Sequence, residues 1–456
     1  MIAPLTLEQL QQRFGGELVN GSVQFDAVCT DTRKLDPAAL FVALRGETFD
    51  AHDFLADVDG KVLGVVSEKR LENSALPQWL VKDTRVALGQ IGRLCREQFS
   101  GPVIGITGSC GKTTVKEMLA GIFGQRHKVC VTQGNLNNHF GVPMTLFSLA
   151  PEHEVLIVEM GASGPNEIGY LCSIANPKIT AVNNVMPAHV EGFGSIDGIA
   201  TAKGQIYTSL DPDGTAVINA DDNYADYWRG EMPEGVRTLE VGFGHQWAVH
   251  PDNIELDARG CPKFDLVVEG VSHPVQLQVL GEHNVHNALV ASGIAHAAGI
   301  PVPEIAAGLG VSSGVAGRMQ SIVGSNGATV IDDSYNANPG SVSAAIEMLA
   351  QRDGKKILVL GDMAELGPDA DSAHREMGLL ARERGIDQLF TLGSLSGAAS
   401  VAFAAGHQHE QRNFSEREPL IKVLAPELDE NTTVLVKGSR SARMELIVQA
   451  LTDGNQ

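Results

Sequence analysis

The fold is decided by one stretch of sequence, Val103-Ile104-Gly105-Ile106-Thr107-Gly108-Ser109-Cys110-Gly111-Lys112-Thr113-Thr114. Its first five residues form a short apolar run with β-branched side chains, which is typical of a buried parallel strand. A glycine-rich loop follows, and a helix is expected to begin near Thr113. This order predicts an anion site, because the N–H groups of the loop and the positive end of the helix both attract phosphate.

In a phosphate loop of this kind, Lys112 bridges the β and γ phosphates of a nucleotide, and the hydroxyl of Thr113 binds Mg²⁺. Counted from Gly105, the loop is one residue longer than the standard GxxxxGK[ST] spacing. The alternative is a glycine-rich turn with a solvated lysine, but the flanking strand and helix favour the nucleotide site. The residues predicted to bind ATP here are Thr107, Gly108, Ser109, Cys110, Gly111, Lys112, Thr113 and Thr114.

Further apolar runs alternate with helical stretches on both sides of a glycine-rich break at 312–314. This rhythm predicts an α/β protein with two doubly wound, mostly parallel sheets, the second of them Rossmann-like. Two runs, 264–268 and 275–279, alternate with turns and predict an antiparallel patch before a helix over 284–298. The remaining strands are expected at 155–158, 179–182, 216–219, 328–331, 357–360, 388–392 and 433–436.

The chain length of 456 residues suggests about three domains. We place them at 1–83, a small mixed α/β domain; 84–313, the central phosphate-loop domain; and 314–456, a C-terminal doubly wound domain. Short strands at 41–44 and 63–66 carry no nucleotide signature, and a helix over 84–99 leads into the second domain.

The composition restricts the class of protein. The net charge of −21 excludes nucleic acid and anionic membrane as the main partner, so an anionic ligand needs local cations, metal ions or backbone N–H groups. Six cysteines without a CxxC pair are not a disulfide framework. Neither a signal peptide nor a run of about 18 apolar residues is found, which predicts a cytoplasmic protein.

Five motifs, spread in order along the whole chain, resemble the Mur ligase family of ATP-dependent amide-forming enzymes. They lie at 105–114, 134–143, 183–194, 358–367 and 436–441. The resemblance implies a monomer that uses ATP and two Mg²⁺ ions to join D-alanyl-D-alanine to a UDP-N-acetylmuramoyl-tripeptide. It also implies an acyl phosphate intermediate and a place in the synthesis of peptidoglycan precursors.

Two alternatives stay open. Another Mur-type ligase or a folylpolyglutamate-type ligase has the same scaffold, although the stretches NLNNHFGVP at 135–143 and GDMAELG at 361–367 argue against it. The other alternative is a regulatory phosphate-loop switch that hydrolyses ATP slowly. A ligase needs both of its other substrates for phosphate release, whereas a switch does not.

The reaction that the resemblance implies brings a carboxylate and a phosphate together, and each pair of unit charges at 4 Å costs about 4 kcal/mol at an effective dielectric near 20. One lysine is therefore not enough. Glu159, at the end of a strand, is placed to bind Mg²⁺ with Thr113. The alternative is a solvated or helix-capping glutamate.

The resemblance also implies a second metal ligand at His189 and a carbamylated Lys203, so that Lys112, His189 and Lys203 form the catalytic set. An ammonium group has no acceptor, but a carbamate made with CO₂ has two acceptor oxygens. Many relatives have Glu where this chain has Gln205, which leaves any metal role at that position open.

The far end of the nucleotide is assigned to two segments. Asn284 and Asn287 lie three residues apart, on one helix face, where their amides can bind adenine or Asn284 can cap the helix. The resemblance favours adenine. It also places Arg318 at the phosphates, Asp333 at the ribose and Asn336 near adenine, so that the third domain closes over ATP and excludes water. The alternative for the acidic pair at 332–333 is helix capping.

The other two substrates are assigned by the resemblance alone. The UDP substrate is expected at Thr32, Arg33, Arg45, Gly46, Asn135 and Asn138, although surface arginines are common. The amino substrate is expected at Lys437, Ser439 and Arg440. Arginine binds a carboxylate with two parallel hydrogen bonds, and a dipeptide carries a free carboxylate.

Overall fold

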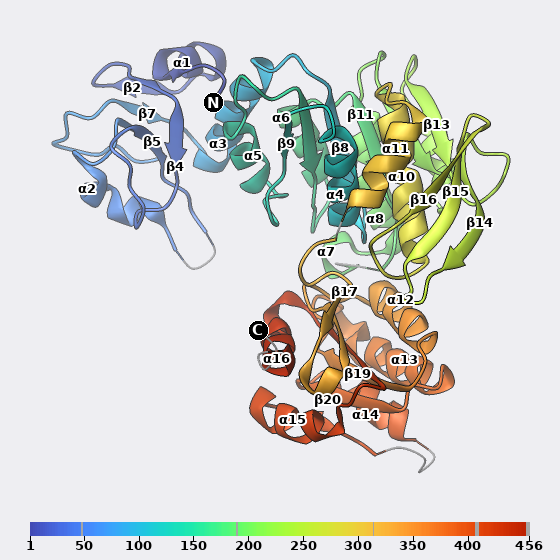
Figure 1. The fold of residues 1–456 in the computed structure, drawn as a ribbon. Coiled ribbons are helices and arrows are strands. Elements are labelled where there is room, and N and C mark those ends of the chain that lie inside the picture. The colour runs from blue at the N-terminus through green and yellow to red at the C-terminus, as the bar shows by residue number, and fades with distance from the viewer. Residues whose placement is uncertain (47–48, 188–189, 313, 406–409, 453–456) are drawn as a thin grey trace.

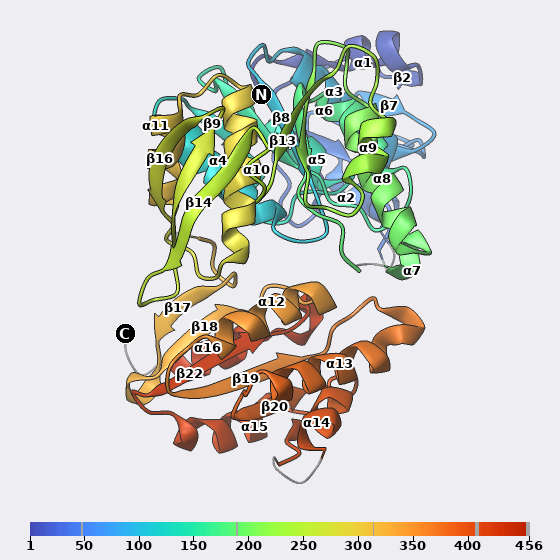
Figure 2. The ribbon, with the colours of Figure 1, turned by 90° about the vertical axis from the view of Figure 1, so that its right-hand side faces the viewer.

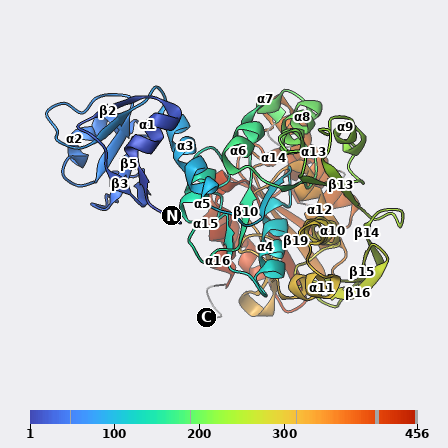
Figure 3. The ribbon, with the colours of Figure 1, turned by 90° about the horizontal axis from the view of Figure 1, so that it is seen from above.

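The computed structural model describes residues 1–46, 49–187, 190–312, 314–405 and 410–452. The α/β fold predicted from the sequence is confirmed: three units follow one another along the chain, each with its own sheet. The first unit lies to one side of the second, and the third lies below the second (Figure 1). Seen from above, helix α3 joins the first unit to the second (Figure 3).

The first unit is built around a five-stranded sheet of short strands. Strands β5 and β6 at its centre are buried along their whole length, and their bounds differ from the predicted ones by one or two residues. A separate antiparallel pair joins β1 (Leu5–Thr6) to β3 (Gln24–Phe25). In sheet order the strands are β2 (Glu17–Val19), β7 (Gln78–Leu80), β6 (Gly64–Ser67), β5 (Ala39–Val42) and β4 (Ala27–Cys29), and the helices are α1 (Leu7–Phe14) and α2 (Leu55–Val58).

Helix α3 (Thr84–Glu97) begins where the sequence predicts it. The Asp83 carboxylate accepts hydrogen bonds from the N–H groups of Arg85 and Val86, which would otherwise lack partners at the helix start. The apolar face of α3 packs against α5 (Gly141–Phe147) and α6 (Glu167–Ala175) of the second unit. It therefore belongs to the central core.

The second unit has a nine-stranded sheet whose core strands are parallel. The apolar runs predicted as strands are confirmed, and β8, which leads into the phosphate loop, lies between β11 and β10. In sheet order the strands are β16 (Val271–Gln276), β15 (Pro262–Val268), β14 (Val249–Leu256), β13 (Arg237–Val241), β12 (Thr215–Asn219), β11 (Ile179–Val182), β8 (Val103–Thr107), β10 (Val155–Glu159) and β9 (Val129–Val131).

The predicted antiparallel patch is confirmed as β14–β15–β16, with one correction. The last strand runs from Val271 to Gln276 and not over 275–279. The reason is a tight hairpin turn at Glu269 and Gly270, which have φ of +47° and +82°. Two residues with positive φ form the hairpin turn that matches the twist of paired strands, so the second strand begins directly after them.

Helices cover both faces of the central sheet and form two apolar cores. Strand residues alternate between the cores: Ile104 and Ile106 face one of them, and Val103 faces the other. One face is covered by α4 (Lys112–Phe123), α10 (His283–Ala297) and α11 (Val302–Val311), and the other by α3, α5, α6 and α8 (Ile196–Thr208). Two short helices, α7 (Val190–Phe193) and α9 (Ala225–Gly230), complete the unit.

The third unit is a six-stranded sheet that is parallel except for its first strand. It confirms the predicted Rossmann-like rhythm, and α12 lies on the side that faces the central unit (Figure 2). In sheet order the strands are β17 (Gln320–Val323), β18 (Thr329–Asp333), β22 (Thr432–Lys437), β19 (Lys355–Gly361), β20 (Gln388–Leu392) and β21 (Asn413–Phe414). The helices are α12 (Pro339–Ala350), α13 (Ala370–Glu383), α14 (Gly397–Ala404), α15 (Arg417–Leu424) and α16 (Glu445–Thr452).

All six cysteines are free thiols. In the part of the chain that the structure describes, no helix is both long enough and apolar enough to cross a membrane.

Candidate active site

The phosphate loop connects β8 to α4 and has the conformation that its glycines allow. Gly111 has φ of +75°, and a Cβ atom there would lie 2.3 Å from Oδ1 of Asn287 and 2.4 Å from Nδ2 of Asn183. Any other residue would therefore displace both amides. Helix α4 begins at Lys112 without a side-chain cap, so the N–H groups of its first turn remain for an anion.

Two lysines meet at one carbonyl group of this loop. Nζ of Lys112 donates to the Gly108 carbonyl at 2.6 Å, and Nζ of Lys203, from α8, donates to the same oxygen at 3.1 Å. Burial lowers the pKa of Lys112. Burial, with the charge of Lys112 adding to it, lowers the pKa of Lys203 to about 7. Among the described residues neither lysine has an ion-pair partner, although the nearby Glu159 carboxylate opposes the lowering of the Lys112 pKa.

The structure brings Glu159 to the same end of the sheet, beside Thr113. The Thr113 hydroxyl donates to Oε2 of Glu159 at 2.8 Å, and Nδ2 of Asn137 donates to Oε1 at 2.8 Å. Glu159 is 2% exposed and ends a strand, so the interpretation as a solvated or helix-capping residue is wrong. A hydroxyl beside a carboxylate is an oxygen donor set of the kind that Mg²⁺ prefers.

The two predicted adenine ligands lie in a buried chain of amide hydrogen bonds. Nδ2 of Asn183 donates to Oδ1 of Asn287, and Nδ2 of Asn287 donates to Oδ1 of Asn284. Nδ2 of Asn183 also donates to the Cys110 carbonyl of the phosphate loop. The capping alternative for Asn284 is wrong, because α10 begins at His283 without a side-chain cap. The amides therefore support the loop, and adenine binding stays a prediction.

The segment after β11 is the part of the site that sequence reasoning missed. The carbonyl of Asn184 accepts a hydrogen bond from the Ser109 N–H at 2.9 Å. The side-chain Oδ1 of Asn184 accepts one from the Cys110 N–H at 2.8 Å. The Ser109 hydroxyl donates to the Met186 carbonyl at 2.9 Å. The available signal was the asparagine pair in the motif at 183–194, which we used only for the family resemblance.

The predicted second metal site is described in part. His189 lies outside the described residues. Nζ of Lys203 lies 5.8 Å from the centroid of the Phe193 ring. Phe193 is the last residue of the short helix α7. The Gln205 amide donates to Asn166 and accepts from the Gly169 N–H of α6, so this side chain serves helix packing.

The third unit brings together residues that the sequence assigned to different substrates. Nζ of Lys437 forms an ion pair with Oδ2 of Asp333 at 2.5 Å and donates to the Asn336 carbonyl at 2.9 Å. Ser439 accepts a hydrogen bond from the Ala364 N–H at 2.8 Å. The ion pair also shows that Asp333 is not a helix cap, a role that Asn338 has for α12. The predicted ATP and amino-substrate groups thus form one cluster.

Two arginines lie against Tyr335 of this unit. The Arg318 guanidinium lies 4.2 Å from the ring centroid, and the Arg440 guanidinium lies 5.7 Å from it. Nε of Arg318 is shielded from solvent and has no hydrogen-bond partner among the described residues. An unpaired buried donor costs free energy unless a ligand supplies the acceptor.

One contact joins the third unit to the phosphate loop. Nδ2 of Asn338, at the start of α12, donates to Sγ of Cys110 at 3.2 Å. Gly340 in the same turn faces Met186, and a Cβ atom there would lie 2.6 Å from its sulfur. Helix α12 therefore abuts the loop and its support segment. Figure 2 shows this helix on the side of the third unit that faces the central unit.

The predicted UDP-site arginines are exposed and already paired. Arg33 forms two hydrogen bonds with Asp31, which lower the pKa of that carboxyl to about 2. Arg45 forms ion pairs with Asp50 at 3.2 Å and Glu68 at 3.1 Å. Thr32 and Gly46 are the chain neighbours of these arginines, and the UDP assignment stays a prediction.

The two predicted substrate asparagines of the central unit differ in their contacts. Oδ1 of Asn138 accepts hydrogen bonds from the N–H groups of Phe140 and Gly141, which starts helix α5. Asn135 is exposed, and its carbonyl accepts from the Asn137 N–H. Asn137 in turn bonds Glu159, so this loop reaches the predicted metal ligands.

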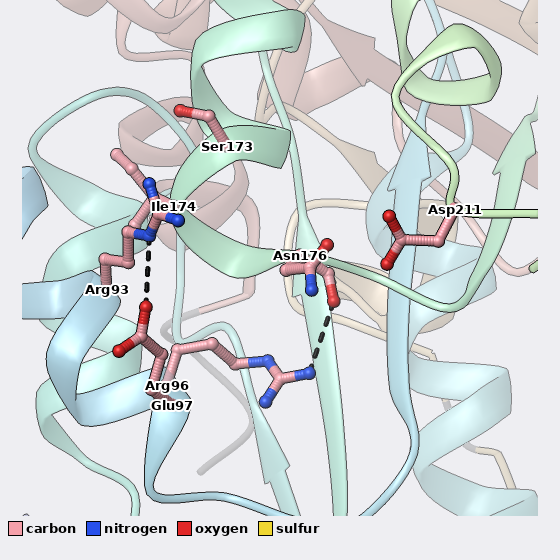
Figure 4. Close-up of a pocket in the computed structure, with 7 residues that line it drawn as sticks. All are labelled: Arg93, Arg96, Glu97, Ser173, Ile174, Asn176 and Asp211. Carbon is pink, nitrogen blue, oxygen red and sulfur yellow. Dashed lines mark hydrogen bonds and ion pairs between the residues drawn. The ribbon is translucent and has the colours of Figure 1, made fainter.

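A separate pocket of about 330 Å³ lies at the opposite end of the central sheet (Figure 4). Its main cation, Arg96, donates to the carbonyls of Ala175, Phe99 and Asn176, and Arg93 pairs with Glu97. The guanidinium groups of this pocket thus already have partners. It is not the candidate active site.

Comparisons with known proteins agree with this geometry. The Mur ligase middle domain family matches residues 106–295, and the Mur ligase, glutamate ligase domain family matches 317–440. The chain is 40% identical to the UDP-N-acetylmuramoyl-tripeptide–D-alanyl-D-alanine ligase of Escherichia coli (strain K12), over 98% of both chains. Its fold matches MurF of Acinetobacter baumannii with a TM-score of 0.91 at 34% identity over 99% of both chains. It also matches MurF of Thermotoga maritima in complex with ADP, with a TM-score of 0.83 at 26% identity over 93% and 96% of the chains.

Proposed function

The chain belongs to the Mur ligase family, and we infer that it is an ATP-dependent ligase that adds D-alanyl-D-alanine to a UDP-N-acetylmuramoyl-tripeptide in peptidoglycan precursor synthesis. The tripeptide carboxylate attacks the γ-phosphate of ATP and gives an acyl phosphate and ADP. The amine of the dipeptide then attacks the acyl carbon, and phosphate leaves. The observation that carries this proposal is the pair of lysines at the Gly108 carbonyl, half-buried Lys112 and buried Lys203, which have no ion-pair partner among the described residues.

We propose that Lys112 and the first turn of α4 bind the β and γ phosphates. The lysine is half-buried, and its hydrogen bonds within the described chain go to carbonyl oxygens of its own loop. A phosphate is a better partner, because it adds Coulomb attraction between opposite charges that a neutral carbonyl does not offer. Transfer of Lys112 from the carbonyl to a phosphate repays part of the cost of its burial.

The oxygen donors beside the loop fit Mg²⁺. Thr113 and Glu159 would hold the ion, which supplies Lewis-acid charge neutralisation at the phosphates when it is bound. Asn137 would keep the Glu159 carboxylate in place from its other oxygen. Thr107 and Asn183 each have a shielded side-chain oxygen without a partner in the described chain, which leaves polar atoms for a ligand beside the loop.

We propose that Lys203 is a carbamate in the active enzyme. A lysine with a pKa of about 7 is about half neutral at pH 7, and only the neutral amine attacks CO₂. The reaction forms one N–C bond, releases one proton and leaves an anion with two acceptor oxygens. With His189, these oxygens would hold the second Mg²⁺.

We propose that the domains divide the substrates as the sequence assigns them. Residues 1–83 hold the UDP end, 84–313 the ATP, and 314–456 close over ATP and bring the amino substrate. The unpaired Nε of Arg318 supports a phosphate contact from the third domain. For Asp333 to bind the ribose, its ion pair with Lys437 has to open or be shared. The cytoplasmic location and the monomeric state stay predictions.

Phosphate release from ATP tests this function. A ligase is expected to release phosphate only when UDP-N-acetylmuramoyl-tripeptide and D-alanyl-D-alanine are both present. Replacement of these substrates by folate and glutamate tests the folylpolyglutamate alternative in the same assay. Equal release without either substrate would instead identify a slow ATP switch. A series of tripeptides that differ in the third residue would then define the natural acceptor.

A further inference from the structure

We propose that the turn between β13 and β14 is a binding site for a divalent transition-metal ion, with His245, His250 and Asp252 as its ligands. One ligand atom from each of these side chains lies within 4.8 Å of the other two. All three residues lie close together in the sequence: His245 is in the loop after β13, and the other two are on β14, which pairs with β13 in parallel at Val241 and Val249. The site is separate from the ATP site and does not depend on the function proposed above.

The ring of His250 is oriented as a metal ligand requires. Its Nδ1 lies 3.0 Å from the Trp247 carbonyl, which can only accept, so Nδ1 carries the proton and donates. The lone pair of Nε2 is therefore free. Metal-binding histidines almost always have such a backbone or carboxylate partner on the other nitrogen, because it fixes the tautomer and the ring.

Asp252 offers an oxygen that accepts no hydrogen bond from the described residues and faces the ring of His245. This atom, Oδ1, is shielded from solvent and lies 3.1 Å from Nδ1 of His245. Metal–nitrogen and metal–oxygen bonds of about 2.0–2.1 Å place two tetrahedral ligands about 3.3 Å apart, so this spacing already suits a shared ion.

The strand ladder adds a reason for a cation at this point. Asp252 lies directly opposite Asp265 of β15, and two like charges in such a pair destabilise a sheet. Asp265 has a donor of its own, Nδ2 of Asn253 at 2.7 Å, whereas Oδ1 of Asp252 has none. A bound cation would supply the missing partner and reduce the repulsion.

The ligand types define the metal class. Two imidazoles and one carboxylate suit Zn²⁺, Co²⁺ or Ni²⁺, whereas Mg²⁺ prefers oxygen ligands alone. An excess of Mg²⁺ is therefore not expected to displace the ion. The turn also carries Phe243, whose ring stacks on His286 of α10 at 5.8 Å, so metal binding would fix a turn that packs on this helix.

Equilibrium dialysis of the full-length chain with Co²⁺, in excess Mg²⁺ and after chelator treatment, tests the site. We expect His245→Gln, His250→Gln and Asp252→Asn each to bind one Co²⁺ fewer per chain, or to bind it at least about tenfold more weakly. His273→Gln on β16, which is separated from β14 by β15, is the matched control and should bind as the wild type does. His245 has a side chain 79% exposed, so its variant should fold normally. Equal Co²⁺ binding in all variants, or none in the wild type, would overturn the proposal.

Discussion

Two buried lysines, Lys203 of the central unit and Lys437 of the third unit, differ in how their charge is balanced. Lys203 and Lys437 are almost equally buried, at 2% and 3% exposure. Lys203 shares a backbone carbonyl with Lys112 and has no described ion-pair partner, whereas Lys437 forms a 2.5 Å ion pair with Asp333. A buried unpaired charge costs several kcal/mol, so the first arrangement is suited to a site completed by an anion. In the second arrangement Asp333 already balances the charge of Lys437, unless a substrate competes for one of these two residues.

The largest effect is expected for Lys112→Ala. Loss of the charge that we propose faces the γ-phosphate should lower kcat about a thousandfold, at the upper end of the range seen when one preorganised donor to the transition state is removed. The melting temperature should not fall, because Lys112 is half-buried and has no ion-pair partner among the described residues. Product formation and thermal melting together check this, and a folded variant with a near-normal rate would refute the site.

The ion pair of the third unit predicts a loss of stability. Asp333→Asn leaves Lys437 buried without a counterion, which should reduce the free energy of unfolding by about 3 kcal/mol. The double variant Asp333→Asn, Lys437→Met should recover much of this loss. Urea unfolding measures both values, and calorimetry should show unchanged affinity for the UDP-tripeptide. An Asp333→Asn variant of wild-type stability would show that the pair is not buried in solution.

The carbamate predicts a rescue that only a missing ligand explains. Lys203→Ala should lose activity by about a hundredfold, and short carboxylates in the buffer should restore part of it. Lys203→Arg keeps a cation but offers no acceptor, so it should stay inactive with or without carboxylate. Initial rates in buffers with and without CO₂ complete the test. Activity in Lys203→Arg would leave Lys203 as an ordinary electrostatic contact.

The lowered pKa of Lys203 predicts how stability changes with pH. Between the native pKa of about 7 and the ordinary value of 10.5, the unfolded chain binds a proton that the native chain does not. The free energy of unfolding should therefore rise with pH in this window, by about 1.4 kcal/mol per unit relative to Lys203→Met. Below pH 7 Lys203 no longer makes stability depend on pH, because it is protonated in both the native and the unfolded state. Denaturant unfolding from pH 6 to 9, without ligand and CO₂, measures the free energy of unfolding of both proteins. The same pH dependence in the wild type and in Lys203→Met would contradict the lowered pKa.

Much of the fold was predictable because its signals are local. Apolar runs such as 155–158 and 179–182 can only be buried strands between helices, and the phosphate loop follows its strand directly. The pairing of Thr113 with Glu159 was also predictable, since the carboxyl ends of neighbouring parallel strands meet at one edge. These inferences need only the period of the sequence and the geometry of a parallel sheet.

The remaining features depend on contacts between distant residues. Asp333 and Lys437 lie 104 positions apart, and Asn183 and Asn287 also lie 104 apart, so no local pattern reveals either pair. Each becomes visible only when strands or helices from different parts of the chain pack together. His245 and His250 have no typical metal spacing in the sequence, and the loop between β13 and β14 brings them to Asp252.

The central claim is that the unneutralised lysine at the phosphate loop binds ATP. Lys116 is the matched control, because it lies one turn further along α4 and is as buried as Lys203, but it pairs with Glu117 and donates to the Thr132 carbonyl. Calorimetric titration with ATP and Mg²⁺ should show an affinity at least about a hundredfold weaker in Lys112→Met, through loss of a charge-assisted hydrogen bond to the phosphates. Lys116→Met should bind within about threefold of the wild type, because no contact with ATP is lost. Equal losses in the two variants, or wild-type affinity in Lys112→Met, would contradict the claim.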